Sequence, residues 1–201
     1  MEHVAHLKKD KKLSQIIAEP YHELKLHKHI ALHLMASIMS QQLNTKVADV
    51  IYRRFLDIYK GNEPTAKQVL NTPFETLRAI GLSNAKVSYV NNVARFCIEN
   101  KITDTKLLAM SNDEVIDLLT QIKGVGRWTV EMLLMFTLGR EDVFAIDDLG
   151  LQNAIVKLYK LKIENKKELR EKILKLSAKW SPYRTYACLY LWQWKDNKPV
   201  T

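Results

Sequence analysis

Apolar residues recur every three to four positions along almost the whole of this 201-residue chain, and no segment alternates with the period of two that marks a half-buried strand. Apolar stripes of this kind predict helices at about residues 4–18, 28–41, 47–58, 83–98, 111–122, 128–138, 149–161 and 167–179, and Ser181 with Pro182 as N-cap and first-turn pair of a last helix. The pattern predicts an all-α fold of about ten to twelve short helices. At this length we expect a single domain over residues 1–201.

Two glycines one residue apart, Gly124 and Gly126, stand between an apolar helical run that ends near Ile122 and another that begins at Trp128. This spacing predicts a hairpin joining two helices over about residues 111–138. Glycine lets backbone amides approach an anion closely, and the second helix adds the unpaired N–H groups of its first turn. The segment therefore predicts a phosphate site, although glycines between helices are often only turn residues.

Side chains beside the glycines strengthen the interpretation as a phosphate site. Lys123 and Arg127 flank the hairpin, and Thr129 stands in the first turn of the second helix. These residues supply positive charge and hydrogen-bond donors where a phosphate would lie. We therefore expect the hairpin to bind a nucleic-acid backbone.

An acidic pair, Asp147 and Asp148, directly precedes the helix expected to begin near Leu149. Aspartate is a preferred N-cap, so a purely structural role accounts for Asp148. That role is compatible with a catalytic one, because a carboxylate fixed at a helix N-terminus stays ionised and can stabilise a cation formed in a reaction. Asp147 either raises one pKa by like-charge repulsion or simply faces solvent.

Aromatic residues concentrate around the hairpin and the last predicted helix. They are Trp128, Trp180, Trp192 and Trp194, with Tyr183, Tyr186 and Tyr190. At helical spacing such residues are usually core, but as a group they can also line a pocket that stacks on a base, above all a positively charged one. We expect two or three of them to line a pocket.

The cysteines and histidines give no metal site. Cys97 and Cys188 are too few for an iron–sulfur cluster, which normally takes four thiolates, and we expect both to be buried core residues. All six histidines fall within residues 3–33 and lack the companions of a zinc site, so a solvated helix face is expected.

The net charge of +9 is unevenly distributed. Residues 157–198 carry twelve Lys and Arg against four Asp and Glu, whereas residues 31–156 carry thirteen against fourteen. A basic excess favours a polyanionic partner such as nucleic acid, but a Lys-rich helix face is also a common solubility device. No apolar run approaches the roughly 20 residues that span a bilayer, and no secretion signal is evident, so we expect no membrane partner and an intracellular location.

Several motifs in matching order resemble the helix-hairpin-helix (HhH-GPD) superfamily of DNA glycosylases, specifically the 3-methyladenine DNA glycosylase II branch. They are SQQLNTKVAD at residues 40–49, GLSNAKVSYV at 81–90, IKGVGRWTVEMLLMFTLGREDVFAIDDLGLQ at 122–152 and WSPYRTYACLYLW at 180–192. The resemblance implies a fold of two helical lobes with the active-site cleft between them.

The resemblance also implies roles for particular residues. Asp148 falls on the family's catalytic aspartate, and Gln42, with Leu43 beside it, falls on the residue that fills the gap left by an extruded nucleotide. Trp192 falls on a tryptophan of the base pocket, and Trp128 is expected to form another wall. The other residues expected to take part are Met132 in the base pocket, Lys123, Gly124, Gly126, Arg127 and Thr129 as DNA contacts, and the backbone carbonyls of Thr120, Ile122 and Val125 as ligands of a sodium or potassium ion.

Two departures from the family pattern refine the expected activity. Members that also cleave the DNA backbone carry a nucleophilic lysine in the first turn after the hairpin, where this chain has Trp128, and tryptophan cannot form a Schiff base. Some members carry a tyrosine where Met132 stands here, which implies weaker stacking and a different substrate range.

The resemblance implies a monofunctional glycosylase that hydrolyses the N-glycosidic bond of alkylated purines such as 3-methyladenine in duplex DNA. Two alternatives stay open: a glycosylase for oxidised or mismatched bases, and a non-catalytic DNA-binding module. We expect no required cofactor, no iron–sulfur cluster, double-stranded DNA as the partner and a monomeric state. The expected location is the cytoplasm with the nucleoid in a prokaryote, or the nucleus in a eukaryote.

Overall fold

A computed structural model describes residues 1–18, 21 and 23–196. Every regular element in these residues is a helix, twelve α-helices and two short 3₁₀ helices, so the all-α prediction is confirmed. The chain divides into two compact units: the terminal unit, Met1–Lys25 with Gly139–Thr201, and the middle unit, Leu26–Leu138. The two helical lobes are thus present, while the single domain and the cleft stay predictions.

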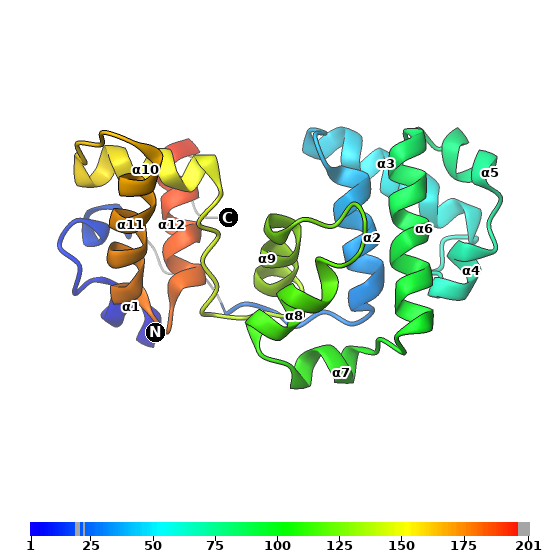
Figure 1. Cartoon of the computed structure of the whole chain (residues 1–201), viewed down its shortest axis with the longest axis horizontal. Helices are drawn as coiled ribbons and strands as arrows, with labels where there is room; N and C mark the ends of the chain where they lie inside the picture. Colours follow the sequence, from blue (N-terminus) through cyan, green and yellow to red (C-terminus); the bar gives the residue numbers. More distant parts are fainter. Residues whose placement is uncertain (19–20, 22, 197–201) are drawn as a thin grey trace. The chain divides into compact units, whose positions relative to one another are not determined.

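The middle unit contains eight helices in its described residues. They are α2 (Ile30–Ser40), α3 (Thr45–Ile58), α4 (Ala66–Leu70), α5 (Phe74–Ala79), α6 (Asn84–Glu99), α7 (Asp104–Ala109), α8 (Asn112–Leu119) and α9 (Arg127–Phe136). Helix α6 packs against α2, α4 and α5, and α2 packs in turn against α3 and α9 (Figure 1). The buried face of α6 includes Val87, Val90 and Val93, whose spacing of three places them on one side of the helix.

Polar caps fix the start of these helices. The Ser83 side chain accepts a hydrogen bond from the Lys86 N–H at the start of α6. Ser111 and Glu114 form the predicted capping box at the start of α8, which satisfies two orphan N–H groups reciprocally. The capping box therefore fixes where α8 begins, and the hairpin follows directly after this helix.

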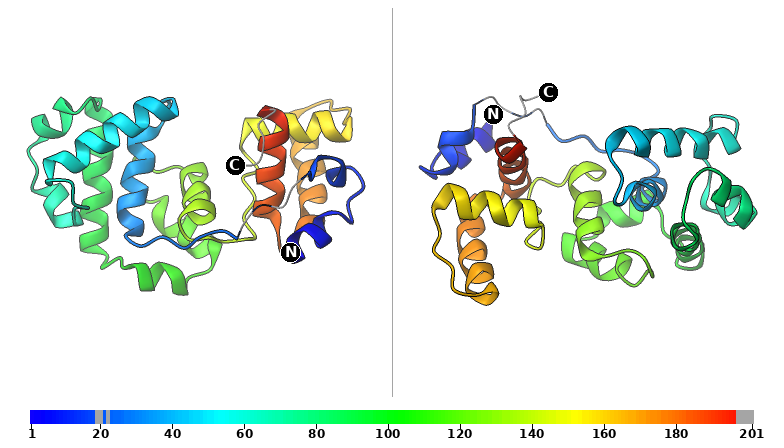
Figure 2. Two further views of the ribbon diagram at one scale, coloured as in Figure 1. Left: turned by 180° about the vertical axis from the view of Figure 1, so that it is seen from behind. Right: turned by 90° about the horizontal axis from the view of Figure 1, so that it is seen from above.

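The terminal unit joins the two ends of the described chain. Its elements are α1 (Glu2–Leu7), η1 (Leu13–Ile16), α10 (Leu149–Tyr159), α11 (Lys166–Ser177), η2 (Ala178–Trp180) and α12 (Arg184–Asp196). Helix α12 packs against α10 and against η1, so an N-terminal segment and a C-terminal helix share one core (Figure 2). Trp180, Tyr186 and Tyr190 are fully buried in that core.

The prediction of one helix over residues 4–18 is wrong. Helix α1 ends at Leu7, and the Asp10 carboxylate then accepts hydrogen bonds from the N–H groups of Lys12 and Leu13. Aspartate competes for backbone donors in this way and favours a turn over a continuing helix. The segment therefore restarts as the short η1.

The predicted cap of the last helix is also wrong. Helix α12 begins at Arg184, and the Arg184 N–H donates to Asp142 Oδ1. Ser181 instead donates its hydroxyl to Asp142 Oδ2 over 2.7 Å. A side chain distant in the sequence thus takes the capping role predicted for Ser181.

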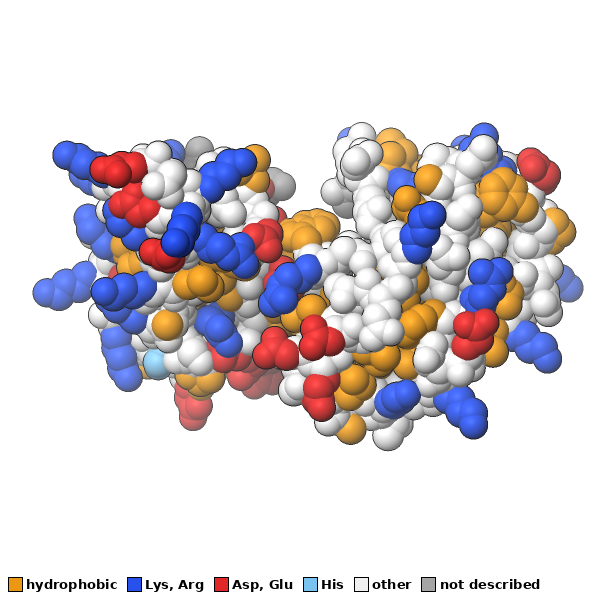
Figure 3. Space-filling model, viewed as in Figure 1, with side chains coloured by type: hydrophobic (Ala, Val, Ile, Leu, Met, Phe, Trp, Pro, Cys, Tyr) orange, Lys and Arg blue, Asp and Glu red, His pale blue; other side chains and the backbone are white. Residues whose placement is uncertain are grey.

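Lysine and arginine side chains gather on the visible face of the terminal unit, as expected from the basic excess of residues 157–198 (Figure 3). No helix in the described part of the chain has both the length and the apolar character needed to cross a membrane.

Candidate active site

The predicted hairpin lies between α8 and α9 and rests on α6. Gly124 adopts a left-handed φ of +103°, and a Cβ at this position would lie 2.2 Å from Cγ of Tyr89. The Asn92 side chain donates to the Lys123 carbonyl over 3.1 Å. Gly124 is therefore required both by its backbone conformation and by close packing on an aromatic ring. The sequence spacing gave no sign of this bracing by Tyr89 and Asn92.

Gly126 has a different role, because it is the N-cap of α9. It makes no side-chain cap, and a Cβ built on it would meet no atom within 4 Å. The first-turn N–H groups of α9 therefore begin at an open surface, where the helix dipole favours an anion. Lys123 is exposed beside them. This geometry suits a phosphate group.

Arg127, predicted as a phosphate contact, forms an ion pair with Glu131 one turn later on α9. The Arg127 Nε and Glu131 Oε1 atoms lie 2.9 Å apart, with the arginine side chain 51% exposed and the glutamate 1% exposed. One of the five guanidinium donors is used in this pair, and the buried carboxylate fixes the direction of the others. Glu131 was missed from the sequence, although its spacing of four from Arg127 is a usable signal.

The Thr129 side chain does not lie where a DNA contact was expected. It is 5% exposed, and its hydroxyl accepts a hydrogen bond of 3.4 Å from the Gln41 side chain. Position 129 lies on the face of α9 that packs against α2, so the prediction of a side-chain contact with DNA is corrected to a contact within the middle unit.

A pocket of about 510 Å³ lies in the middle unit between the end of α2 and α9. Its lining is Ser37, Ser40, Gln41, Gln42, Leu43, Trp128, Thr129, Met132 and Phe136. The volume falls in the range of roughly 300–1,000 Å³ that is typical of small-ligand sites. Trp128 and Met132, both predicted as base-pocket residues, thus share one pocket, and their side chains and that of Phe136 follow one another at a spacing of four. Phe136, 46% exposed, was missed.

Gln42, predicted to fill the gap in the DNA stack, lies in the connection between α2 and α3. It is exposed and adopts a left-handed φ of 60°, a conformation that residues other than glycine rarely take. Leu43, next to it, is half-buried and lines the pocket just described. The two residues are placed on the same rim as Trp128.

Asp148 is the N-cap of α10 in the terminal unit. Its Oδ1 atom accepts a hydrogen bond from the Leu151 N–H at 2.7 Å and another from the Trp192 indole N–H at 3.1 Å. Asp148 is therefore a half-buried carboxylate of fixed direction, and this geometry is compatible with both the structural and the catalytic interpretation. Trp192, predicted to line a base pocket, holds this carboxylate, a contact that the sequence did not reveal.

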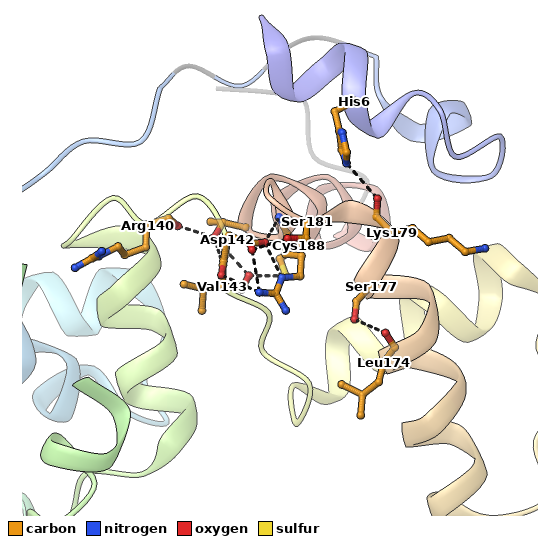
Figure 4. A network of polar contacts seen from close by, with 11 residues as sticks. His6, Arg140, Asp142, Val143, Leu174, Ser177, Lys179, Ser181 and Cys188 are labelled. Atoms are coloured by element: carbon orange, nitrogen blue, oxygen red, sulfur yellow. Dashed lines mark hydrogen bonds and ion pairs between the residues drawn. The ribbon is translucent and has the colours of Figure 1, made fainter. Parts of the chain in front are cut away.

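The loop that leads to Asp148 is fastened to the start of α12 (Figure 4). Asp142 accepts hydrogen bonds from Arg184 Nε at 2.6 Å and Nη2 at 2.9 Å, and the Thr185 hydroxyl donates to the Arg140 carbonyl at 2.6 Å. Burial alone would raise the pKa of Asp142, but the hydrogen bonds from Arg184 and Ser181 outweigh it and hold the pKa below its usual value. Helix α12 thus positions the loop at its first turn and Asp148 through Trp192.

Asp147, the neighbour of Asp148, faces solvent, which was one of the two interpretations of this residue. Asp147 is exposed and pairs with Arg170 of α11.

The two thiols are core residues, as predicted: Cys97 lies buried in α6 and Cys188 in α12. Burial raises the pKa of Cys97 to about 11, so this thiol stays protonated.

The carbonyls predicted to hold a monovalent ion lie at the bend of the hairpin. The Ile122 carbonyl accepts the Val125 N–H at 2.9 Å, which leaves it a second lone pair for a cation. The Thr120 hydroxyl donates to the Ile116 carbonyl at 2.7 Å, so this hydroxyl is already engaged within α8 and its C-cap. The donor type fits sodium or potassium, and the ion stays a prediction.

Comparison with known proteins places the chain in a family. Residues 35–179 match HhH-GPD, described as the HhH-GPD superfamily of base excision DNA repair proteins. This chain belongs to the HhH-GPD superfamily. The HhH-GPD resemblance inferred from the motifs is therefore confirmed.

Two curated relatives and one solved structure are also similar to this chain. The chain is 40% identical over 178 residues to DNA-3-methyladenine glycosylase 1 of Schizosaccharomyces pombe, which covers 87% of this chain and 72% of the relative. It is 32% identical over 166 residues to a putative DNA-3-methyladenine glycosylase of Bacillus subtilis, covering 80% of this chain and 57% of that protein. A structure of the S. pombe 3-methyladenine DNA glycosylase in complex with abasic DNA superposes with a TM-score of 0.81 at 34% identity, covering 96% of both chains.

Within this HhH-GPD chain the predicted site residues fall into two groups. The hairpin, Trp128, Met132, Gln42 and Leu43 belong to the middle unit. Asp148 and Trp192 belong to the terminal unit. Each group is internally well defined by the contacts given above.

Proposed function

We propose that this chain is a monofunctional DNA glycosylase that hydrolyses the N-glycosidic bond of alkylated purines such as 3-methyladenine in duplex DNA. This reaction is the first step of base excision repair. The observation that carries the proposal is the Asp148 carboxylate, fixed by Leu151 and Trp192 in a chain whose relatives are named DNA-3-methyladenine glycosylases.

The hairpin supplies the sequence-independent grip on DNA. The first-turn amides of α9, open at Gly126, accept a phosphate, and Lys123 with Arg127 adds charge around it. Contacts of this kind fix the register of the protein on the duplex but do not read its sequence.

The damaged nucleotide must leave the stack before its glycosidic bond can be reached. Gln42 fills the gap that the nucleotide leaves. The extruded base lies against the aromatic and thioether side chains of the base pocket, among them Trp128 and Met132. A purine alkylated at N3 or N7 is a cation, so cation–π attraction favours it over an undamaged base.

Hydrolysis breaks the bond between C1′ of the sugar and the purine nitrogen, and the bonding electron pair leaves with the base. An alkylated purine is already positively charged and departs without protonation by a general acid. The carboxylate of Asp148 stabilises the oxocarbenium-like sugar. The oxygen of a water molecule then bonds to C1′, and the water proton passes to Asp148 or to solvent. The product is free base and an abasic site.

Strand cleavage does not follow in this proposal, because Trp128 stands in the first turn of α9 where lyase relatives have a lysine. An indole cannot form the Schiff base with C1′ on which cleavage depends. The chain is thus expected to leave the DNA backbone intact.

The proposal includes the partners and the ion. The protein acts as a monomer on double-stranded DNA, in the cytoplasm with the nucleoid or in the nucleus.

A sodium or potassium ion at the carbonyls of Thr120, Ile122 and Val125 would fix the shape of the hairpin. Raising potassium or sodium chloride should then increase the melting temperature more than choline chloride at equal ionic strength.

An excision assay on purified protein tests the function. Duplexes carrying alkylated, oxidised, deaminated or mismatched bases are incubated with the protein, and free base and strand breaks are measured separately. We expect release of 3-methyladenine and no strand break before alkali is added. Preferential release of an oxidised or mismatched base would replace the substrate class, and binding of all duplexes without base release would leave a DNA-binding module.

A further inference from the structure

The connection between α2 and α3, residues 41–44, is here called the plug turn. Gln42 in this turn has a left-handed φ of 60° and an exposed side chain. Such a conformation costs a residue with a side chain on the order of 1 kcal/mol or more, so it persists only where the surroundings hold it. Something in the middle unit must therefore fix the backbone of this turn.

A backbone hydrogen bond from the Leu43 N–H to the Ser40 carbonyl at 3.1 Å closes this turn. Lys86 of α6 adds a second restraint from outside the turn. Its Nζ atom donates to the Met39 carbonyl at 2.8 Å and to the Gln41 carbonyl at 2.7 Å. These carbonyls stand on either side of the C-terminal end of α2, and α2 has no basic residue in its own last turn. The ammonium therefore satisfies orphan carbonyls and complements the negative end of the helix dipole.

Further contacts restrain the rest of the plug turn. The Gln41 side chain donates to the Thr129 hydroxyl of α9, and the Asn44 side chain caps α3 by accepting the Val47 N–H at 3.0 Å. The Gln41 and Asn44 side chains are thus both engaged in hydrogen bonds, and the residue between them with an exposed side chain is Gln42. Of the side-chain restraints, the two bonds from Lys86 act on the backbone directly before Gln42.

We propose that Lys86 is a positioning residue that fixes the plug turn, so that Gln42 projects outward to fill the gap left by an extruded nucleotide. This inference rests on the proposed function, since it concerns the nucleotide extrusion step. Lys86 touches neither base nor sugar in this role. It acts only through the backbone of residues 39–41.

Ordinary helix capping is the competing explanation, and the chain contains a matched control. Lys106 donates its Nζ to the Asn100 carbonyl at 3.0 Å, at the C-terminal end of α6. Both ammonium groups bind backbone carbonyls at a helix C-terminus, Lys86 half-buried with two bonds and Lys106 exposed with one, but Asn100 carries no predicted DNA contact. A role in capping alone predicts that Lys86→Met and Lys106→Met both lower the melting temperature and that neither changes nucleotide extrusion.

The test compares Lys86→Met, Lys86→Arg, Lys106→Met and Gln42→Ala. Extrusion is followed by the fluorescence of 2-aminopurine stacked beside a tetrahydrofuran abasic analogue, and catalysis by single-turnover release of 3-methyladenine from dimethyl-sulfate-treated duplex DNA. A misplaced plug should lower the release rate and the fluorescence change by about tenfold in Lys86→Met and in Gln42→Ala. Lys106→Met should match the wild type, and Lys86→Arg, which keeps the charge and the donors, should recover most of the loss.

A double-mutant cycle decides whether Lys86 works through Gln42. In the Gln42→Ala background, Lys86→Met should add little further loss. Three outcomes would each overturn the inference. The losses of the two substitutions could multiply in the double mutant, Lys86→Met could match Lys106→Met, or Lys86→Arg could be as impaired as Lys86→Met.

Failure of the proposed function would appear differently. A wild-type protein that releases no base from methylated DNA contradicts the proposed function, whereas the fluorescence cycle needs no chemistry and still tests Lys86. A wild-type protein that releases base, with multiplying losses in the cycle, contradicts only the role of Lys86.

Discussion

Trp192 donates its indole N–H to Asp148 Oδ1 at 3.1 Å, and the same oxygen accepts the Leu151 N–H at 2.7 Å. One donor comes from α12 and the other from the first turn of α10. Two donors converging on one oxygen fix the direction of the carboxylate. The contact joins a residue predicted to be catalytic to one predicted only to line a pocket.

Replacing Trp192 by Phe removes the N–H but keeps the aromatic ring. Hydrogen bonds to charged groups contribute about 1.5–3 kcal/mol, so single-turnover base release should slow by about tenfold or more. Binding to an abasic duplex should change little. Trp180→Phe is the matched control, because the Trp180 indole N–H also donates to a carboxylate, Asp10 Oδ2 at 3.2 Å, but in the buried core. It should lower the melting temperature and leave the rate unchanged; equal rates for both variants would contradict the positioning role of Trp192.

Asp148→Asn should abolish most base release from alkylated duplex DNA while DNA binding persists. Asparagine is also a good N-cap and can still accept the Leu151 N–H, so the fold should survive. The lost charge should cost about 100- to 1,000-fold in the rate, as for other groups that stabilise developing charge. Release of 3-methyladenine measured under single-turnover conditions, with binding followed by fluorescence anisotropy, checks this. A variant that releases base at the wild-type rate would show that another group carries the chemistry.

Local sequence signals predicted much of this molecule. The capping box at Ser111, the hairpin glycines and the cap at Asp148 all depend on residues within about four positions of one another, and each lies where the spacing placed it. The signals failed where a distant partner decided the outcome. Asp142 caps α12 from about 40 positions away, so Ser181 lost the role that its position suggested.

The candidate site shows the same division. The motif predicted a catalytic role for Asp148, but only the structure shows its bond to Trp192, which joins residues 44 positions apart. Lys86 lies within a recognised motif, yet only the packing of α6 on α2 shows which carbonyls it serves. Contacts between helices depend on tertiary packing, and the periodicity within one helix does not predict which residues of another helix it will contact.

Gly124→Ala and Gly126→Ala should separate the fold of the hairpin from its grip on DNA. Alanine at 124 meets both an unfavourable φ of +103° and the Tyr89 ring, so the free energy of unfolding should fall by about 2 kcal/mol or more. Alanine at 126 enters open space at an N-cap, where the cost should be below about 1 kcal/mol.

The DNA affinity of the two variants completes that comparison. A methyl group at 126 stands where a phosphate would approach, so Gly126→Ala should bind duplex DNA several-fold more weakly at a nearly unchanged melting temperature. Urea unfolding and anisotropy titrations at fixed salt measure the two effects. Wild-type affinity in Gly126→Ala would show that the phosphate does not approach α9 at this residue.

Asp142→Asn should destabilise the protein in a pH-dependent manner. The pKa of Asp142 is held below its usual value in the fold, so its charge contributes stability above the unfolded pKa of about 3.9, and that stability is lost as the pH falls through the folded pKa. Asparagine keeps the shape but loses the charge-assisted bonds to Arg184, at a cost of about 1–2 kcal/mol near neutral pH.

The difference in melting temperature between wild type and Asp142→Asn should therefore be largest at pH 6–7 and shrink below about pH 4. The pKa of Asp10 is also lowered, because its hydrogen bonds from Tyr159 and from backbone N–H groups outweigh burial. That contribution is present in both proteins and cancels in the difference. A difference that stays constant from pH 7 to pH 3 would mean that the Asp142 charge adds nothing, and that the packing of the loop on α12 holds Asp148 in place without it.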